Sequence, residues 1–140
     1  MTDEPRIDDY PRRTADKLRY ADTDRQGHVN NAVFATFFET GRVALLYDPD
    51  GPLHAPDGAF VIAKLSVDFL GEILWPGTVE IGTAVASIGR SSVRLEQSLF
   101  QNGRRVAAAE SVIVHIGTLD RKSSPLPAHA LAALEACKRV

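Results

Sequence analysis

The chain has 140 residues, of which 44% are hydrophobic, and a formal net charge of −2 at pH 7. That length fits one domain, and the apolar fraction is enough for a packed core, which argues against an intrinsically disordered chain. Basic residues are scattered along the sequence, so the charge pattern gives no electrostatic footprint for a nucleic-acid partner.

The first half of the chain predicts an arm, a short strand and one long helix. Residues 1–13 are charged and contain prolines, which indicates a flexible N-terminal arm, and residues 14–20 predict a weak strand. From Asn31 to Leu46 the apolar positions recur at steps of three and four, as on one face of an amphipathic helix. Asn30 or Asn31 can cap this helix, and Asp48-Pro49 ends it.

The second half predicts four strands and a short terminal helix. The strands are expected over residues 60–70, 78–88, 91–101 and 104–119, and the helix over 128–140. In the first of these strands the apolar face is expected to comprise Val61, Ala63, Leu65, Val67 and Phe69. Asn102-Gly103 is a strong two-residue hairpin signal. A long helix beside strands joined by hairpins is an α+β pattern, in which the helix covers one face of an antiparallel sheet.

Several site and compartment classes are disfavoured by the rest of the sequence. Cys137 is the only cysteine, so an internal disulfide and a thiolate metal site are both excluded. No apolar run approaches the ~20 residues of a membrane span, and the N-terminus is unlike a signal peptide. We therefore expect a cytoplasmic protein without a metal or other cofactor.

The loop before the long helix carries the most informative pattern. It reads DTDRQGHVNN over residues 22–31, and the helix then supplies Phe34, Phe38, Glu39 and Arg42. This pattern resembles the signature of the 4-hydroxybenzoyl-CoA and long-chain acyl-CoA thioesterases, in which such a loop opens the central helix of a hotdog fold. The resemblance implies a single hotdog domain over residues 14–140, with an antiparallel sheet wrapped around the helix.

Position by position, the resemblance places the catalytic carboxylate on Asp24, with Gln26 and His28 as partners in the same loop. It places the N–H group that polarises the thioester carbonyl near Asn31. A helix N-terminus presents unpaired N–H groups and a positive dipole end, which suits an oxyanion. A carboxylate beside it can attack the carbonyl to form an anhydride or can deprotonate a water, and the sequence leaves both routes open. Gly27 permits the tight backbone path of the loop.

Further residues are expected to contact the substrate. Ser91 and Ser92 occupy the hairpin where related enzymes contact CoA, and Arg90 and Lys64 supply the cations that its phosphates need. The acyl pocket is expected to involve Gly27, Phe34, Phe38, Glu39, Phe60 and Ile62.

Other interpretations stay open for some of these residues. Asp22 is interpreted as a turn or surface acid, and His28 either acts in the site or braces the loop. Glu39 and Arg42, three residues apart on the helix, either pair with each other or Glu39 reaches the site. Phe34 and Phe38 are core residues first.

The resemblance also implies a homo-oligomer, a dimer or a tetramer, with active sites at the interface. We expect the long strand from Arg104 and the helix face to bury against a second copy, because an uncovered strand edge invites pairing. The function implied is hydrolysis of an acyl-CoA or acyl-carrier-protein thioester to the free acid and the thiol. The alternatives are a hotdog hydratase or dehydratase and a non-catalytic acyl-CoA-binding module.

Overall fold

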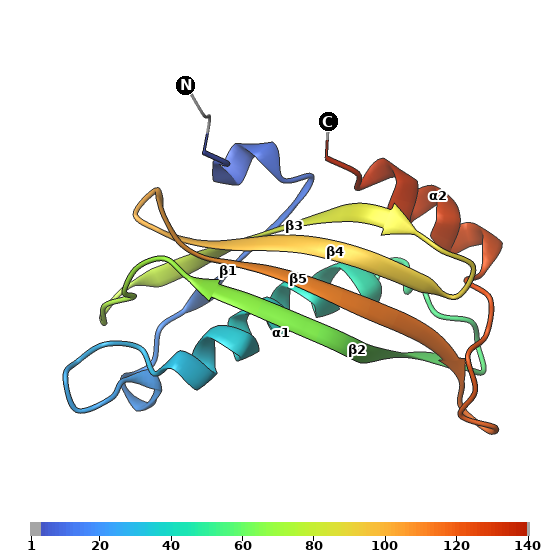
Figure 1. Ribbon diagram of the computed structural model, residues 1–140, viewed down its shortest axis with the longest axis horizontal. Coiled ribbons are helices and arrows are strands. Elements are labelled where there is room, and N and C mark those ends of the chain that lie inside the picture. The colour runs from blue at the N-terminus through green and yellow to red at the C-terminus, as the bar shows by residue number, and fades with distance from the viewer. Residues whose placement is uncertain (1–3, 140) are drawn as a thin grey trace.

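The computed structural model describes residues 4–139 and arranges them as one sheet with helices on both faces (Figure 1). The elements are η1 (Ile7–Asp9), β1 (Arg12–Lys17), η2 (Tyr20–Asp22), α1 (Asn31–Leu46), β2 (Gly58–Phe69), β3 (Thr78–Ile88), β4 (Ser92–Gln101), β5 (Arg104–Gly117) and α2 (Ala128–Ala136). The strand order is β1-β3-β4-β5-β2, and every neighbouring pair is antiparallel. α1 lies along one face of the sheet, while α2 and η1 lie on the other. This α+β architecture is predicted by the sequence pattern, and it is the hotdog domain that the family resemblance implies.

The helix α1 has the bounds that the sequence predicts. Asn30 is its N-cap, because the side-chain Oδ1 of Asn30 accepts the N–H of Ala32 at 2.9 Å. Asp48-Pro49 follows the last turn and ends the helix. The apolar side chains of the buried stripe are Phe34, Phe37, Phe38, Leu45 and Leu46.

Gly41 allows α1 to approach the sheet closely. A Cβ at this position would lie 2.6 Å from Ile81 Cγ2 and 2.7 Å from Gln97 Nε2. The buried Gln97 donates from Nε2 to the carbonyl of Phe38 and to Thr83 Oγ1, both at 3.0 Å. These hydrogen bonds tie the middle of α1 to β3 and β4.

The described part of the predicted N-terminal arm packs on the opposite face of the sheet. Tyr10 is 2% exposed, and its hydroxyl lies 2.6 Å from Ser98 Oγ. Its ring meets Phe100 edge-on, with centroids 6.1 Å apart. The first strand begins at Arg12 rather than at residue 14. Residues 1–3 of the arm lie outside the described residues.

The terminal helix α2 covers the neighbouring part of that face. It buries Ala130 and Leu134 and ends at Ala136, earlier than predicted. The carbonyl of Cys137 then accepts the N–H of Val85 at 2.8 Å, which joins the end of this helix to β3. No helix within residues 4–139 is long and apolar enough to cross a membrane.

The strand order corrects the prediction about the sheet edge. The long strand from Arg104 is β5, which is hydrogen-bonded on both sides, to β4 and to β2. The edges are the short, charged β1 and the longer β2. Ile62, Leu65 and Phe69 on β2 are 37–52% exposed, and Leu70 beyond it is 53% exposed. The long apolar edge is therefore β2.

A β-bulge changes which residues of β2 face the helix. The register shifts between Ile62 and Lys64, so Ala63 is an extra residue in the pairing with β5. Phe60 and Ile62 face α1 before the bulge. The helix-facing residues after it are Leu65, Val67 and Phe69. The uninterrupted alternation predicted for this strand is therefore wrong before the bulge, because one inserted residue reverses the two faces.

Candidate active site

The loop between η2 and α1 closes on itself as a tight turn. The N–H of Asp24 donates to the carbonyl of His28 at 2.7 Å, and Thr23 pairs with Val29 across the loop. Gly27 has a φ of +81°, and its N–H donates to the carbonyl of Asp24 at 3.2 Å. Because this left-handed conformation favours glycine, Gly27 provides the tight backbone path that the sequence predicts.

The carboxylate of Asp24 is exposed and is oriented by its own loop. Its Oδ1 accepts the backbone N–H of Gln26 at 2.8 Å and that of His28 at 3.2 Å. Its Oδ2 makes no hydrogen bond to any residue of the described part of the chain. One oxygen is thus fixed while the other faces solvent, open to a water or a substrate.

The N-terminus of α1 begins at Asn31, at the end of the loop that carries Asp24. The N–H of Ala32 is used by the Asn30 side chain, and the N–H of Val33 donates to the Asn30 carbonyl at 2.9 Å. The N–H of Asn31 has no acceptor within residues 4–139. The first turn therefore presents one unpaired donor at the positive end of the helix dipole.

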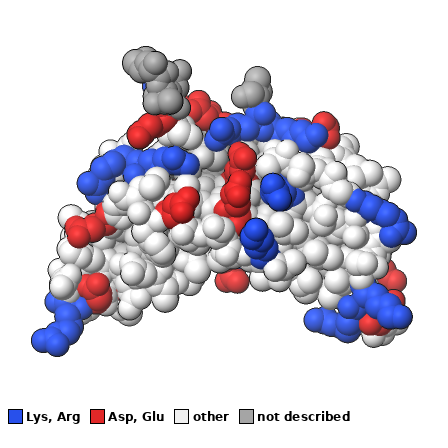
Figure 2. Space-filling view, viewed as in Figure 1, with Lys and Arg blue, Asp and Glu red and all other residues white. Residues whose placement is uncertain are grey.

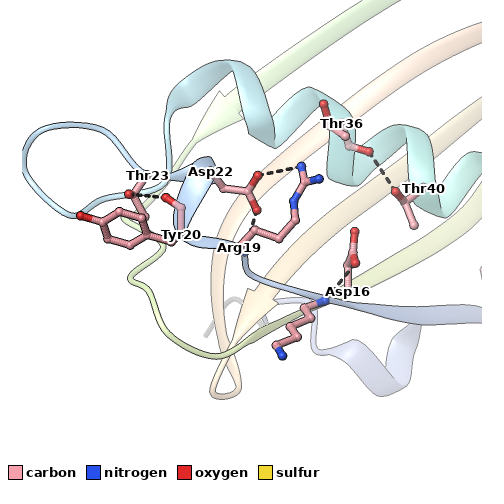
Figure 3. Close-up of polar contacts among 8 residues, drawn as sticks. Asp16, Arg19, Tyr20, Asp22, Thr23, Thr36 and Thr40 are labelled. Atoms are coloured by element: carbon pink, nitrogen blue, oxygen red, sulfur yellow. Dashed lines mark hydrogen bonds and ion pairs between the residues drawn. The ribbon is translucent and has the colours of Figure 1, made fainter.

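Asp22 is buried, and its interpretation as a surface acid is wrong, although it does lie in a turn, η2. Its two carboxylate oxygens accept the backbone N–H and the Nη2 of Arg19, each at 2.9 Å (Figure 3). Its carbonyl accepts the N–H of Asn30 at 2.8 Å. Burial raises the pKa of Asp22, but the hydrogen bonds and charge of Arg19 outweigh it and hold that pKa below its ordinary value. Asp22 therefore joins the start of the loop to the cap of α1.

The side chains of His28 and Gln26 make no hydrogen bond to the Asp24 carboxylate within residues 4–139. His28 Nε2 lies 3.3 Å from Glu72 Oε2, and the His28 backbone pairs with Leu74. Glu72 and Leu74 belong to the connection between β2 and β3. Within residues 4–139, Gln26 and His28 meet the Asp24 carboxylate only through their backbone N–H groups. This geometry favours the loop-bracing role for His28.

Comparisons with known proteins agree with this combination of fold and loop. The family model described as the thioesterase-like superfamily matches residues 18–134. The chain belongs to this superfamily. A curated relative named acyl-CoA thioester hydrolase YbgC, from Escherichia coli O6:H1, is 28% identical over 120 residues, which cover 83% of this chain and 90% of the relative.

Two solved structures show the same fold over nearly the whole chain. The PA5185 protein from Pseudomonas aeruginosa PAO1 has a TM-score of 0.85 and 28% identity, with 96% of each chain covered. A thioesterase from Thermus thermophilus, complexed with coenzyme A and Zn, has a TM-score of 0.77 and 30% identity, with 92% of this chain and 95% of that chain covered. In the present member of the thioesterase-like superfamily, no three His, Cys, Asp or Glu side chains within residues 4–139 form a group that could hold a metal ion.

Apart from Gly27, which lies in the Asp24 loop, the predicted acyl-pocket residues divide into two groups. Phe34 and Phe38 are 2% and 0% exposed and belong to the core. Glu39, Phe60 and Ile62 line a cavity of about 230 Å³ beside the C-terminal half of α1. The second group is thus available to a ligand, whereas the first shapes the interior.

The predicted CoA contacts lie away from Asp24 in a single chain. Lys64 is on the sheet face opposite α1, beside Arg94 and Glu110. Arg90 and Ser91 lie in the β3–β4 turn, and Ser92 begins β4. This turn is near the C-terminal end of α1, whereas the Asp24 loop lies at its N-terminal end (Figure 1). Acidic and basic side chains are interspersed on the face shown in Figure 2, so that face offers no continuous positive patch for the phosphates of CoA.

Arg42 is the residue whose position the sequence interpretation missed. It is 8% exposed and lines the same cavity as Glu39, but the two side chains form no ion pair within 4.0 Å in the described part of the chain. Its burial could have been read from its spacing, because it follows Phe38 by four residues and precedes Leu45 by three on the apolar stripe.

Proposed function

We propose that this chain hydrolyses acyl-CoA thioesters to the free acid and CoA, with Asp24 as the catalytic carboxylate. The observation that carries the proposal is the exposed Asp24 carboxylate, held by two backbone N–H groups in the loop that leads into the unpaired N–H of Asn31. The name of the YbgC relative and the coenzyme A in the Thermus thermophilus structure support CoA as the thiol, ahead of an acyl-carrier protein.

In this proposal the N–H of Asn31 and the carboxylate of Asp24 have separate tasks. The thioester carbonyl oxygen accepts the N–H of Asn31, and the helix dipole stabilises the negative charge that develops on it. In one route Asp24 Oδ2 attacks the carbonyl carbon, the C–S bond breaks, the thiolate leaves, and water hydrolyses the resulting anhydride. In the other route Asp24 takes a proton from a water, which attacks the same carbon.

Isotope labelling detects the anhydride route when water opens the anhydride at the Asp24 carbonyl. In a single turnover in ¹⁸O-water, direct attack by water labels the product acid. An anhydride that water opens at the Asp24 carbonyl instead leaves the label in Asp24, where mass spectrometry of the peptide detects it.

The active unit we propose is a homo-oligomer, at least a dimer, assembled through β2. Its apolar residues Ile62, Leu65 and Phe69 are 37–52% exposed on an unpaired edge, which favours pairing with another strand. Two-fold, antiparallel pairing of β2 with its copy sets the Phe69 end of each strand beside the Gly58 end of the other. The Asp24 end of one protomer then approaches the β3–β4-turn end of its partner, which would bring both sets of predicted contacts to one substrate.

Thiol release from a panel of acyl-CoA substrates of different chain length and aromatic content tests the proposal. The same acyl groups on an acyl-carrier protein test the choice of thiol. Binding of acyl-CoA without thiol release would favour the binding module. Hydration of an enoyl-CoA without thiol release would favour the hydratase.

A further inference from the structure

The connection between β2 and β3, residues 70–77, supplies a backbone partner for the Asp24 loop. The N–H of Val29 donates to the carbonyl of Ile73 at 2.9 Å, and His28 pairs with Leu74 as an isolated antiparallel bridge. Both segments lie at the same end of the molecule (Figure 1). The Asp24 loop therefore closes on itself and also pairs with a segment that is distant in the sequence.

His28 links this connection to the Asp24 carboxylate. Its N–H donates to Asp24 Oδ1 at 3.2 Å, and its carbonyl accepts the N–H of Asp24 at 2.7 Å. Its backbone also pairs with Leu74. Because hydrogen bonds weaken steeply as their geometry is lost, a displacement of Leu74 that moves His28 would release one of the two donors that orient Asp24.

Side-chain packing holds only part of the connection in place. Ile73 is fully buried, but Leu74 and Trp75 are 46% and 43% exposed. Glu72 approaches His28 at 3.3 Å, but their side chains are 63% and 29% exposed, and such ion pairs contribute little to stability. The position of Leu74 therefore depends on an anchor other than its own burial.

Gln101, the last residue of β4, provides this anchor. It is 6% exposed, its Oε1 accepts the N–H of Leu74 at 3.0 Å, and its Nε2 donates to the carbonyl of Leu74 at 2.7 Å. Within residues 4–139 its side chain forms hydrogen bonds to Leu74 alone. An amide side chain that uses both its acceptor and its donor on one residue takes the place of a neighbouring strand.

We propose that Gln101 is a positioning residue of the candidate active site. By holding the backbone of Leu74 it fixes His28, and through His28 it fixes the orientation of the Asp24 carboxylate. The inference rests on the proposed function, because it takes Asp24 as the catalytic carboxylate. Gln101 acts through this chain of contacts and has no task in the chemical step itself.

The first test is thiol release from acyl-CoA by Gln101→Leu. We expect kcat to fall about 10-fold or more, because a small misplacement of a catalytic group is costly, while KM stays within about 2-fold. The matched control is Tyr10→Phe, which removes a buried hydrogen bond to Ser98 of β4 on the opposite face of the sheet and should keep both constants.

A double variant asks whether the effect passes through Asp24. In an Asp24→Asn background, Gln101→Leu should cause almost no further loss of kcat, because a residue that acts through Asp24 has nothing left to position. A further loss as large as that in the wild-type background would show that Gln101 acts by another route, and the inference would be wrong.

Hydrogen exchange followed by NMR tests the anchoring independently of activity. In Gln101→Leu the N–H groups of Asp24 and Val29 should exchange at least about 10-fold faster, while those of the β3–β4–β5 ladder exchange as in wild type. Should Gln101→Leu not fold, Gln101→Glu serves instead. It keeps the size and the acceptor for the Leu74 N–H, but it sets a second oxygen against the Leu74 carbonyl.

The remaining outcomes are distinguishable. Unchanged exchange at Asp24 and Val29, or equal acceleration throughout the sheet, would overturn the inference, because Gln101 would then have no local effect on the loop. Faster exchange of the loop with normal kcat would overturn its role in catalysis. If the wild-type protein releases no thiol, the proposed function fails, and the exchange rates alone decide whether Gln101 holds the Asp24 loop.

Discussion

Replacing Asp24 by Asn changes the chemistry of the candidate site while keeping its geometry. The two hydrogen bonds that orient the carboxylate arrive at Oδ1 from backbone N–H groups, and an amide oxygen can accept both. The variant loses the negative charge and the free Oδ2, which are the features that a nucleophile or base requires. Because the net stabilisation from each retained hydrogen bond is about 0.5–1.5 kcal/mol, we expect folding and assembly to be preserved.

The loss should therefore appear in the chemical step. Removing a general base typically lowers kcat by roughly 10²–10⁴, which corresponds to about 2.7–5.4 kcal/mol of activation free energy. The assay is CoA release from the best substrate of the panel, with thermal melts to confirm folding. Asp57→Asn is the matched control, since Asp57 is an exposed loop acid outside the candidate site and its variant should retain wild-type turnover. Near-normal kcat in Asp24→Asn would show that the catalytic assignment is wrong.

Three other variants test the fold and the assembly. Asp22→Asn should lower the melting temperature at neutral pH. Because the pKa of Asp22 is depressed in the folded state, its contribution to stability is present above the unfolded-state pKa and is lost as pH falls through the folded-state pKa. The melting temperatures at pH 7 and pH 3 should therefore differ less in the variant than in wild type. Leu65→Lys should dissociate the oligomer in light scattering and reduce thiol release, whereas Ala15→Lys on the other edge strand should do neither. Gly41→Ala should lower the free energy of unfolding by about 1–3 kcal/mol in urea titrations, because the new Cβ would meet Ile81 at 2.6 Å. An increase of up to ~1 kcal/mol, as helix propensity alone predicts, would contradict the close packing.

The sequence by itself determined the features that depend on neighbouring residues. The bounds of α1 follow from its helical period, its Asn30 cap and the Asp48-Pro49 stop, all of which act within a few residues. The turn at Asn102-Gly103 has positive φ at both residues, +53° and +78°, as the hairpin signal predicts. The loop that positions Asp24 is local too, since its carboxylate is held by its own backbone.

Only the tertiary structure decided the features that depend on distant partners. Alternation of apolar and polar residues does not specify the order of strands in a sheet. The exposed apolar edge is therefore β2, and the strand from Arg104 is internal. The bulge at Ala63 reversed the faces of the first part of β2 and turned Phe60 and Ile62 toward α1, because one extra residue changes the parity of every position on one side of it. Asp22 looks like a surface charge in sequence, and its burial follows from how the η2 turn packs, where long-range contacts outweigh the polarity of a side chain.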